Sequence, residues 1–195
     1  MNTDTTDNGT GSAKSAFGDK GTNVNSIAYG HPYAEQIIES ATKVIRESST
    51  GKKLLVMLDK KLVPLHIMKG KGEIGFSPDM GTIIMQVPGN IDKALPEHIL
   101  RLIKALHESA QERAGHKAPS PQKDIMAYAS FIHGRNLDSI VEVCKILKEL
   151  TNSSYYPVLL DSMEKIGLNK VYKAYLSGKS RDELYDEYAE AYETL

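Results

Sequence analysis

The residues best suited to chemistry form one short stretch, His107-Glu108-Ser109-Ala110-Gln111. Two histidines four residues apart on a helix can bind a zinc ion through their ring nitrogens, and a glutamate after the first can act as general base for a metal-bound water. Here glutamine occupies the second histidine position, so only one imidazole is present. Glu108 is therefore a candidate catalytic base only if the chain is active.

This stretch lies in a segment that the sequence predicts to be a helix over residues 95–114. Apolar residues recur there at helical spacing, Pro96 suits the first turn, and Gly115 suits the position just after the last turn. On such a helix His107 and Gln111 lie together on the flank of the apolar stripe. A single partner element could therefore contact both side chains.

A second predicted helix supplies a candidate partner, Asn136. The apolar residues between positions 125 and 150 follow one helical stripe, and Asn136 falls at its centre as the one polar member. We expect a continuous helix of about 28 residues, with Ser120 as its cap and Pro121 in its first turn, which Gly134 could kink.

An amide buried in an apolar stripe needs hydrogen-bond partners, because leaving it unsatisfied costs about 1–3 kcal/mol. His107, Gln111 or His133 could supply them to Asn136. His116 lies nine residues after His107, beyond the expected end of its helix. A metal site that uses His107 with His116 or His133 is an alternative that the sequence leaves open.

Composition and charge limit the classes of function. The chain has 195 residues, 41% of them hydrophobic, which suits one domain plus a tail, and its 24 basic residues nearly balance 25 acidic ones. This balance argues against nucleic acid or a membrane as the main partner. The one cysteine, Cys144, falls on an apolar stripe, and we expect it to be a buried hydrophobe. Without a signal sequence or a spanning segment we expect a cytoplasmic protein, although export without a signal leaves no trace in a sequence.

The chain order predicts an α+β domain over residues 28–195, preceded by a polar, disordered tail over residues 1–27. A helix is expected over residues 31–48. Short apolar runs over residues 52–88 predict a small antiparallel meander of three or four strands, with a first hairpin at 53–67 and a second around a Pro-Asp turn at 77–81. Pro64 marks an edge strand or a bulge. The spacing of Gly70, Gly72 and Gly75 is not followed by a helix, so it does not predict a nucleotide site.

The part from residue 94 to residue 195 is expected to be helical. Three shorter helices follow the long one, over residues 156–166, 168–176 and 181–195, and Ser180 and Glu183 form a capping-box pattern for the last. Tyr185, Tyr188 and Tyr192 lie along one side of that helix. They predict an aromatic stripe toward the core or, as the alternative, a surface that binds a partner.

Three segments together resemble a known family: residues 76–85 with their Pro-Asp turn, residues 105–111, and residues 132–139 of the long helix. They resemble the zincins whose third zinc ligand is a glutamate. They are similar in particular to a poorly characterised family of predicted bacterial zinc metallopeptidases whose long helix bears an Arg-x-x-Glu-Ala-Asp-Ala stretch. The resemblance spans roughly residues 52–150. It implies a zincin-like scaffold, with a zinc ligand at position 111 and another near position 136.

The chain departs from that pattern at both ligand positions, because Gln111 and Asn136 are neutral amides and poor zinc ligands. Three interpretations remain. The favoured one is a pseudoenzyme that binds an unknown protein or peptide and no cofactor, with a vestigial site of His107, Gln111, His133 and Asn136. The second is a zinc-dependent peptidase or hydrolase with Glu108 as base and with His107 and His116 on the metal. The third is an unrelated helical interaction protein.

Overall fold

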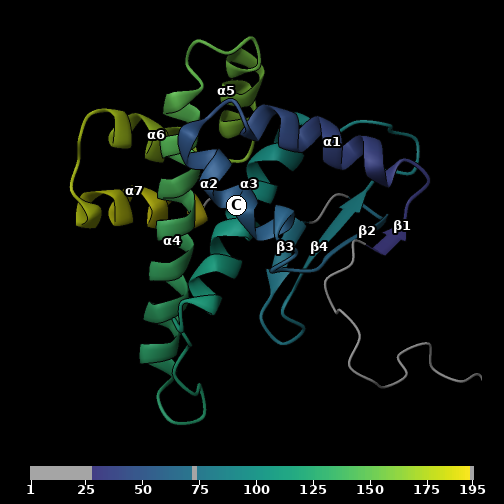
Figure 1. The fold of residues 1–195 in the computed structure, drawn as a ribbon. Helices are drawn as coiled ribbons and strands as arrows, with labels where there is room; N and C mark the ends of the chain where they lie inside the picture. Colours follow the sequence, from purple (N-terminus) through teal and green to yellow (C-terminus); the bar gives the residue numbers. More distant parts are fainter. Residues whose placement is uncertain (1–27, 72–73, 194–195) are drawn as a thin grey trace, which may run out of the picture.

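The computed structural model describes residues 28–71 and 74–193 (Figure 1). In chain order its elements are β1 (Ala28–Gly30), α1 (Ala34–Ile45), α2 (Ser49–Asp59), β2 (Leu65–Lys69), β3 (Ile74–Ser77), β4 (Thr82–Val87), α3 (Pro96–Arg113), α4 (Ile125–Glu149), α5 (Tyr156–Lys165), α6 (Asn169–Leu176) and α7 (Arg181–Glu193). The predicted class, mainly helical α+β, is confirmed. The predicted tail over residues 1–27 lies outside the described residues. Within the described part of the chain, no helix has the length and apolar character needed to cross a membrane.

The four described strands form a mixed sheet with the order β1-β2-β4-β3. β1 with β2 and β2 with β4 are parallel pairs, and only β3 with β4 is antiparallel. The predicted antiparallel meander is therefore wrong. It was predicted from neighbouring segments, whereas parallel pairing joins strands that do not follow one another directly in the chain. The second predicted hairpin is confirmed as β3–β4. At its turn Gly81 has a φ of 59° and donates its N–H to the Pro78 carbonyl at 3.2 Å.

The first predicted hairpin is wrong, because residues 53–58 belong to helix α2. A short apolar run fits a buried strand and a helix equally well. The residues before the run favour the helix, because the Ser48 hydroxyl accepts the Gly51 N–H at 2.9 Å and caps the first turn. Pro64 is not on an edge strand either. It precedes β2, which has neighbours on both sides, and its carbonyl accepts the Ile83 N–H.

A carboxylate from the other end of the chain also contacts the start of α2. Glu149, the last residue of α4, accepts hydrogen bonds from the Ser48 hydroxyl at 2.6 Å, the Ser49 hydroxyl at 3.0 Å, and the N–H (3.0 Å) and hydroxyl of Thr50. We call this group the Glu149 contact. Desolvation acts to raise the pKa of Glu149, but these hydrogen bonds outweigh it and lower the pKa to about 2.

The helix predicted over residues 95–114 is confirmed as α3, and it lies at the centre of the fold (Figure 1). It contacts β3 and β4 on one side and α4 and α5 on the other, and it also touches α1 and α2 (Figure 1). Its Leu102, Ile103 and Leu106 are almost fully buried, as are Ile67, Ile83 and Met85 of the sheet. Gly115 follows the helix with a φ of 88°, as expected of a residue that ends it.

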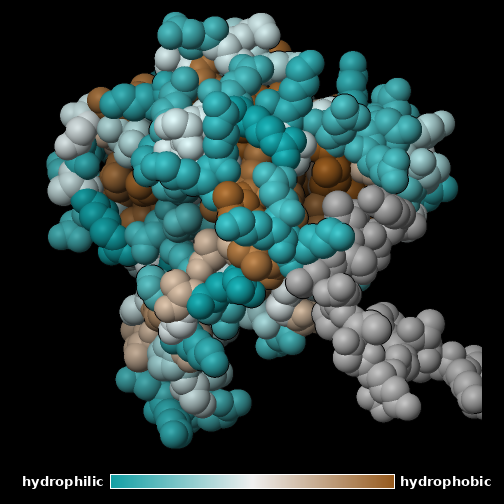
Figure 2. Space-filling model, viewed as in Figure 1, coloured by the Kyte–Doolittle hydropathy of each residue, from teal (hydrophilic) through white to brown (hydrophobic). Residues whose placement is uncertain are grey.

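Helix α4 is continuous past Gly134, as predicted, but its cap lies four residues after the predicted Ser120 cap. The cap is Asp124, whose carboxylate accepts the Ala127 N–H at 2.9 Å, whereas the Ser120 hydroxyl is bonded to the Gln122 side chain. The first turns of α4 and the loop before them project from the body (Figure 1). On this projection intermediate and hydrophobic residues lie above a hydrophilic tip (Figure 2).

Helices α5, α6 and α7 confirm the three predicted helices, and the capping box is present. Glu183 accepts the Ser180 N–H at 2.8 Å, and the Ser180 hydroxyl accepts the Glu183 N–H at 3.4 Å. Of the tyrosine stripe, Tyr188 is 4% exposed and Tyr185 is 37% exposed, so only part of it faces the core. Tyr192 lies outside the described side chains. Cys144 is buried as expected, and burial raises the pKa of its thiol to about 12.

Candidate functional site

The predicted site residues His107 and Gln111 meet helix α4 at Ser139, a residue to which the sequence drew no attention. His107 Nδ1 lies 3.1 Å from the Ser139 Oγ, and that hydroxyl lies 3.4 Å from Gln111 Oε1 and 3.1 Å from the Arg135 carbonyl. Ser139 is fully buried and Gln111 is 7% exposed. We call this group, His107 with Gln111 and Ser139, the Ser139 contact. It joins the C-terminal half of α3 to the middle of α4.

The hydrogen bonds around Ser139 favour one tautomer of His107. The single hydroxyl proton of Ser139 has acceptor oxygens from Gln111 and Arg135 within reach, so the consistent assignment is that His107 Nδ1–H donates to the Ser139 oxygen. Desolvation by burial lowers the pKa of His107, and it outweighs the carboxylates of Glu142, Asp138 and Glu108 that act to raise it. The imidazole is therefore neutral at neutral pH, and the contact holds no net charge.

Glu108 and Asn136 belong to a second polar group on the same two helices. The Glu108 carboxylate, 6% exposed, accepts from the Lys104 ammonium one turn earlier on α3. Lys104 Nζ also donates to Asn136 Oδ1 at 3.3 Å. The Glu108 carboxylate thus contacts Lys104 and not His107, so the geometry does not place it as base for a water beside His107.

The predicted place of Asn136 at the centre of the apolar stripe is wrong. Asn136 is half-buried, and the buried face of α4 runs through Leu137, Ile140, Val143, Cys144 and Leu147. The prediction placed Asn136 midway between the apolar residues Ile132 and Ile140, four residues from each. In the structure Leu137 and Cys144 are also buried, and they turn the buried face away from that line. Neither His107 nor Gln111 is a hydrogen-bond partner of Asn136.

The other candidate histidines do not join this group. His116 is exposed on the loop after α3, and the half-buried His133 packs its ring edge against Tyr188 at a centroid distance of 6.5 Å. Among the described residues, no three His, Cys, Asp or Glu side chains are grouped so that they could hold a metal ion. Beside His107 the contact offers a hydroxyl and a neutral amide, and this donor set does not fit zinc.

A further histidine matters for the fold although its spacing gave no signal. His98 is 2% exposed, and its Nδ1 accepts the Leu95 N–H at 3.2 Å, so an imidazole caps the start of α3. Desolvation by burial lowers the pKa of His98, against the effect of Glu97, so this cap is also neutral. Sequence rules for helix starts expect Glu or Gln at this position, which is why the histidine was missed.

A cavity of about 290 Å³ opens beside the Lys104 group, with Ile74, Arg101, Lys104, Asn136, Ile140 and Tyr188 in its wall. Arg101 is exposed, and the described residues offer it no hydrogen bond or ion pair. Ile74 belongs to β3, which stands at one end of the strand order and has a free edge in the described sheet. A concave, mostly apolar surface with a free cation and a strand edge is suited to binding an extended chain.

A smaller cavity of about 250 Å³ lies between Gln111, the first half of α4 and Arg181 at the start of α7. Its two arginines are both paired. Arg135 binds Glu112 at 2.9 Å, and Arg181 binds Asp138 at 2.9 Å. It therefore presents little free charge to a ligand.

The geometry alone gives two helices joined by a neutral polar contact, with a cavity beside it. Known proteins add nothing to this description. No protein-family model, no curated protein and no solved structure matches the chain, and the resemblance to zinc metallopeptidases stays a prediction.

Proposed function

We propose that this chain is a non-catalytic binding protein on a metallopeptidase-like scaffold. The observation that carries the proposal is the Ser139 contact. Gln111 stands at the position where the family pattern has its second histidine, and its side-chain oxygen lies within reach of the Ser139 hydroxyl rather than among other metal ligands. His107 is likewise engaged at Nδ1. We therefore propose that the side chains at two metal-ligand positions of the family pattern now join helices α3 and α4.

The arrangement also gives no support to a serine hydrolase built on the pair of His107 and Ser139. Their separation of 3.1 Å suits a nucleophile and its base. However, Ser139 is fully buried between α3 and α4, so a substrate carbonyl cannot reach its oxygen. In this proposal the hydroxyl is a structural hydrogen-bonding group.

The partner that we infer is an extended peptide placed along the free edge of β3. Main-chain hydrogen bonds to an edge strand give affinity without regard to sequence, and a neighbouring pocket selects a side chain. The cavity beside Ile74 would take an apolar side chain, and Arg101 at its wall would favour a peptide with a carboxylate nearby. The strand is open at Gly75, because nothing lies within 4 Å of the place that a Cβ on this residue would take.

Metal content tests the non-catalytic part of the proposal. Protein purified without an affinity tag, for wild type and His107→Ala, is analysed for bound zinc and assayed on unfolded casein with added zinc. We expect well under one zinc per chain and no cleavage from either protein. Stoichiometric zinc that is lost in His107→Ala, with casein cleavage by wild type alone, would establish the zinc-dependent hydrolase instead.

Peptide selection tests the binding part. A displayed library of random peptides is selected on the full chain, and the peptides are then measured by fluorescence anisotropy against Arg101→Glu and against Lys52→Glu, a charge reversal on an exposed residue of α2. We expect acidic, partly apolar peptides that lose affinity only with Arg101→Glu. Peptides that bind both variants equally would argue against this surface and favour an unrelated helical interaction protein.

A further inference from the structure

A third cavity, of about 340 Å³, lies away from the Ser139 contact, between α1 and the starts of α3 and α5. Its wall is mainly apolar and includes Val44, Ile99, Val158 and Leu159. Three of these are core residues, and Val158 is 45% exposed. An apolar hollow that reaches the core is the usual setting for a small-molecule site, although this volume is at the low end of the ~300–1,000 Å³ typical of such sites.

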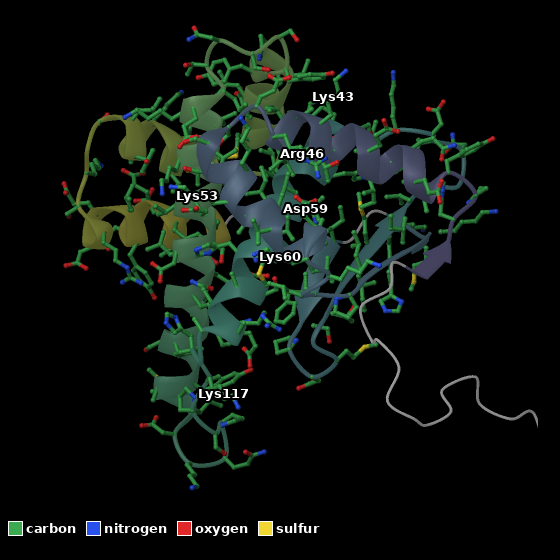
Figure 3. The ribbon with its side chains drawn as sticks, viewed as in Figure 1. Lys43, Arg46, Lys53, Asp59, Lys60 and Lys117 are labelled. Carbon is green, nitrogen blue, oxygen red and sulfur yellow. The ribbon has the colours of Figure 1, made fainter. Side chains whose placement is uncertain are left out.

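Two lysines give the cavity its chemical character. Lys43 of α1 and Lys93, just before α3, both line it and are exposed. Neither makes an ion pair with any described residue, in contrast to Arg46 one turn along α1, which pairs with Asp59 at 2.7 Å (Figure 3). No carboxylate is among the described residues that line the cavity. Its free charge is therefore entirely positive, and α3 and α5, whose positive ends lie here, add to it.

The two lysines sit on a framework that holds them at one cavity. The Ser40 hydroxyl of α1 donates to the Ile37 carbonyl at 2.8 Å and accepts the Ala94 N–H at 2.7 Å. This fastens the residue after Lys93 to the turn of α1 before Lys43. The cavity is thus formed before any ligand arrives, which lowers the cost of binding.

We propose that this cavity binds a small aliphatic carboxylate, with the carboxylate at Lys43 and Lys93 and the tail against Val44, Ile99 and Leu159. The combination of unpaired cations with an apolar interior selects a molecule that has both an anionic head and an apolar chain. The volume suits a medium-length chain rather than a folded partner. This site shares no residue with the peptide surface proposed above, so either proposal can fail without the other.

Octanoate is the probe for this site, titrated into the full chain below its micelle concentration and followed by amide shifts in two-dimensional NMR and by calorimetry. We expect one saturable site per chain, with shifts confined to residues 37–45, 93–99 and 155–160. The double variant Lys43→Gln/Lys93→Gln should weaken octanoate by about three- to tenfold, as expected for two partly exposed ion pairs. The matched control is Lys53→Gln, on an exposed lysine of α2 that does not line the cavity (Figure 3).

Two further ligands separate the head from the tail. Octanol lacks the carboxylate, so it should bind wild type more weakly than octanoate does, and the two ligands should bind the double variant with equal affinity. Acetate lacks the apolar tail and should give no saturable shift. Val158→Glu, which puts a carboxylate on an exposed position at the cavity, should also reject octanoate while leaving the fold unchanged by circular dichroism. Failure of octanoate to bind, or equal binding by wild type and the lysine variant, would overturn the proposal.

Discussion

Two of the polar contacts that hold helix α4 differ in charge, burial and origin. The Ser139 contact in its middle joins neutral groups, and its serine is fully buried. The Glu149 contact at its end centres on an exposed carboxylate that accepts hydrogen bonds from three hydroxyls and a backbone N–H. The first lies where the sequence suggested chemistry. The second lies where it suggested nothing, although it holds the carboxylate whose pKa falls to about 2.

The difference shows that residue type is a poor guide to charge. Histidine and glutamate are reactive in a wet or metal-bound site, but at this helix interface the half-buried His107 has a lowered pKa because its charged form loses solvation. At the surface, three residues that start a helix offer several hydrogen-bond donors to one carboxylate, and together they favour the anion strongly. Loss of charge or a fall in pH should therefore weaken the Glu149 contact. Substitutions that create a cavity or remove a hydroxyl should weaken the Ser139 contact.

The largest effect is expected from Gly51→Ala, which would displace the backbone that forms the Glu149 contact. A Cβ on Gly51 would lie 2.2 Å from the Ile45 carbonyl oxygen, so α1 and the start of α2 must move apart. We expect a loss of about 3 kcal/mol or more in the free energy of unfolding, measured by urea denaturation. Gly75→Ala, where nothing lies within 4 Å, is the control. Equal effects of the two substitutions would mean that the close approach at Gly51 is relieved without cost.

Glu149→Gln should come next, at about 1.5–2 kcal/mol, because charge-assisted hydrogen bonds become neutral ones. The carboxylate has a lowered pKa in the folded state, so its contribution is full above the unfolded value near 4.5 and is lost as pH falls toward about 2. The wild type and the variant should therefore converge in melting temperature over that interval. Glu47→Gln, an exposed glutamate at the end of α1, controls for loss of charge alone. A constant difference between wild type and Glu149→Gln at all pH values would contradict the assignment.

Ser139→Ala should cost about 1–2 kcal/mol, since it removes a buried hydroxyl and leaves His107 and Gln111 without their shared partner. Its effect should not depend on salt, in contrast to that of Glu149→Gln. Ser130→Ala, on an exposed position of the same helix, is the matched control. A neutral result for Ser139→Ala would show that water replaces the hydroxyl and that the contact does not hold the helices.

The smallest effect is the pH dependence of His107. Its pKa is lowered in the folded state, so below the unfolded value of about 6.5 the unfolded chain binds the proton first and stability falls. We expect the melting temperature of His107→Gln to decline less than that of wild type between pH 7.5 and pH 5.5. His116→Gln, on an exposed histidine, should follow wild type. His98 acts in the same direction and accounts for part of the remaining slope. Parallel curves for wild type and His107→Gln would show that His107 does not carry a lowered pKa.

The sequence predicted long periodic elements well and non-local pairing poorly. Helices α1, α3 and α5 to α7 follow from apolar spacing with proline and glycine at their ends, and the β3–β4 hairpin follows from its turn. Helix α2 was missed because its apolar run is short, and the parallel sheet because no local signal pairs β2 with β4.

At the site, the place of His107 and Gln111 on one flank of α3 was predicted. Ser139 was missed, since a serine counts neither as an apolar residue nor as a metal ligand. The ion pair of Glu108 with Lys104 was not predicted, although a spacing of four residues on a helix allows such a pair.

The distance along the chain between the two halves of each contact bears on the order of folding. His107 and Ser139 are 32 residues apart, whereas Ser48 and Glu149 are 101 residues apart. Closing the longer loop costs more entropy, and contacts distant in sequence form late. We expect pulse-labelled hydrogen exchange to protect the amides of α3 and α4 before those in the first turn of α2. Protection of the amides at the capped start of α2 would then show that the chain has completed its folding.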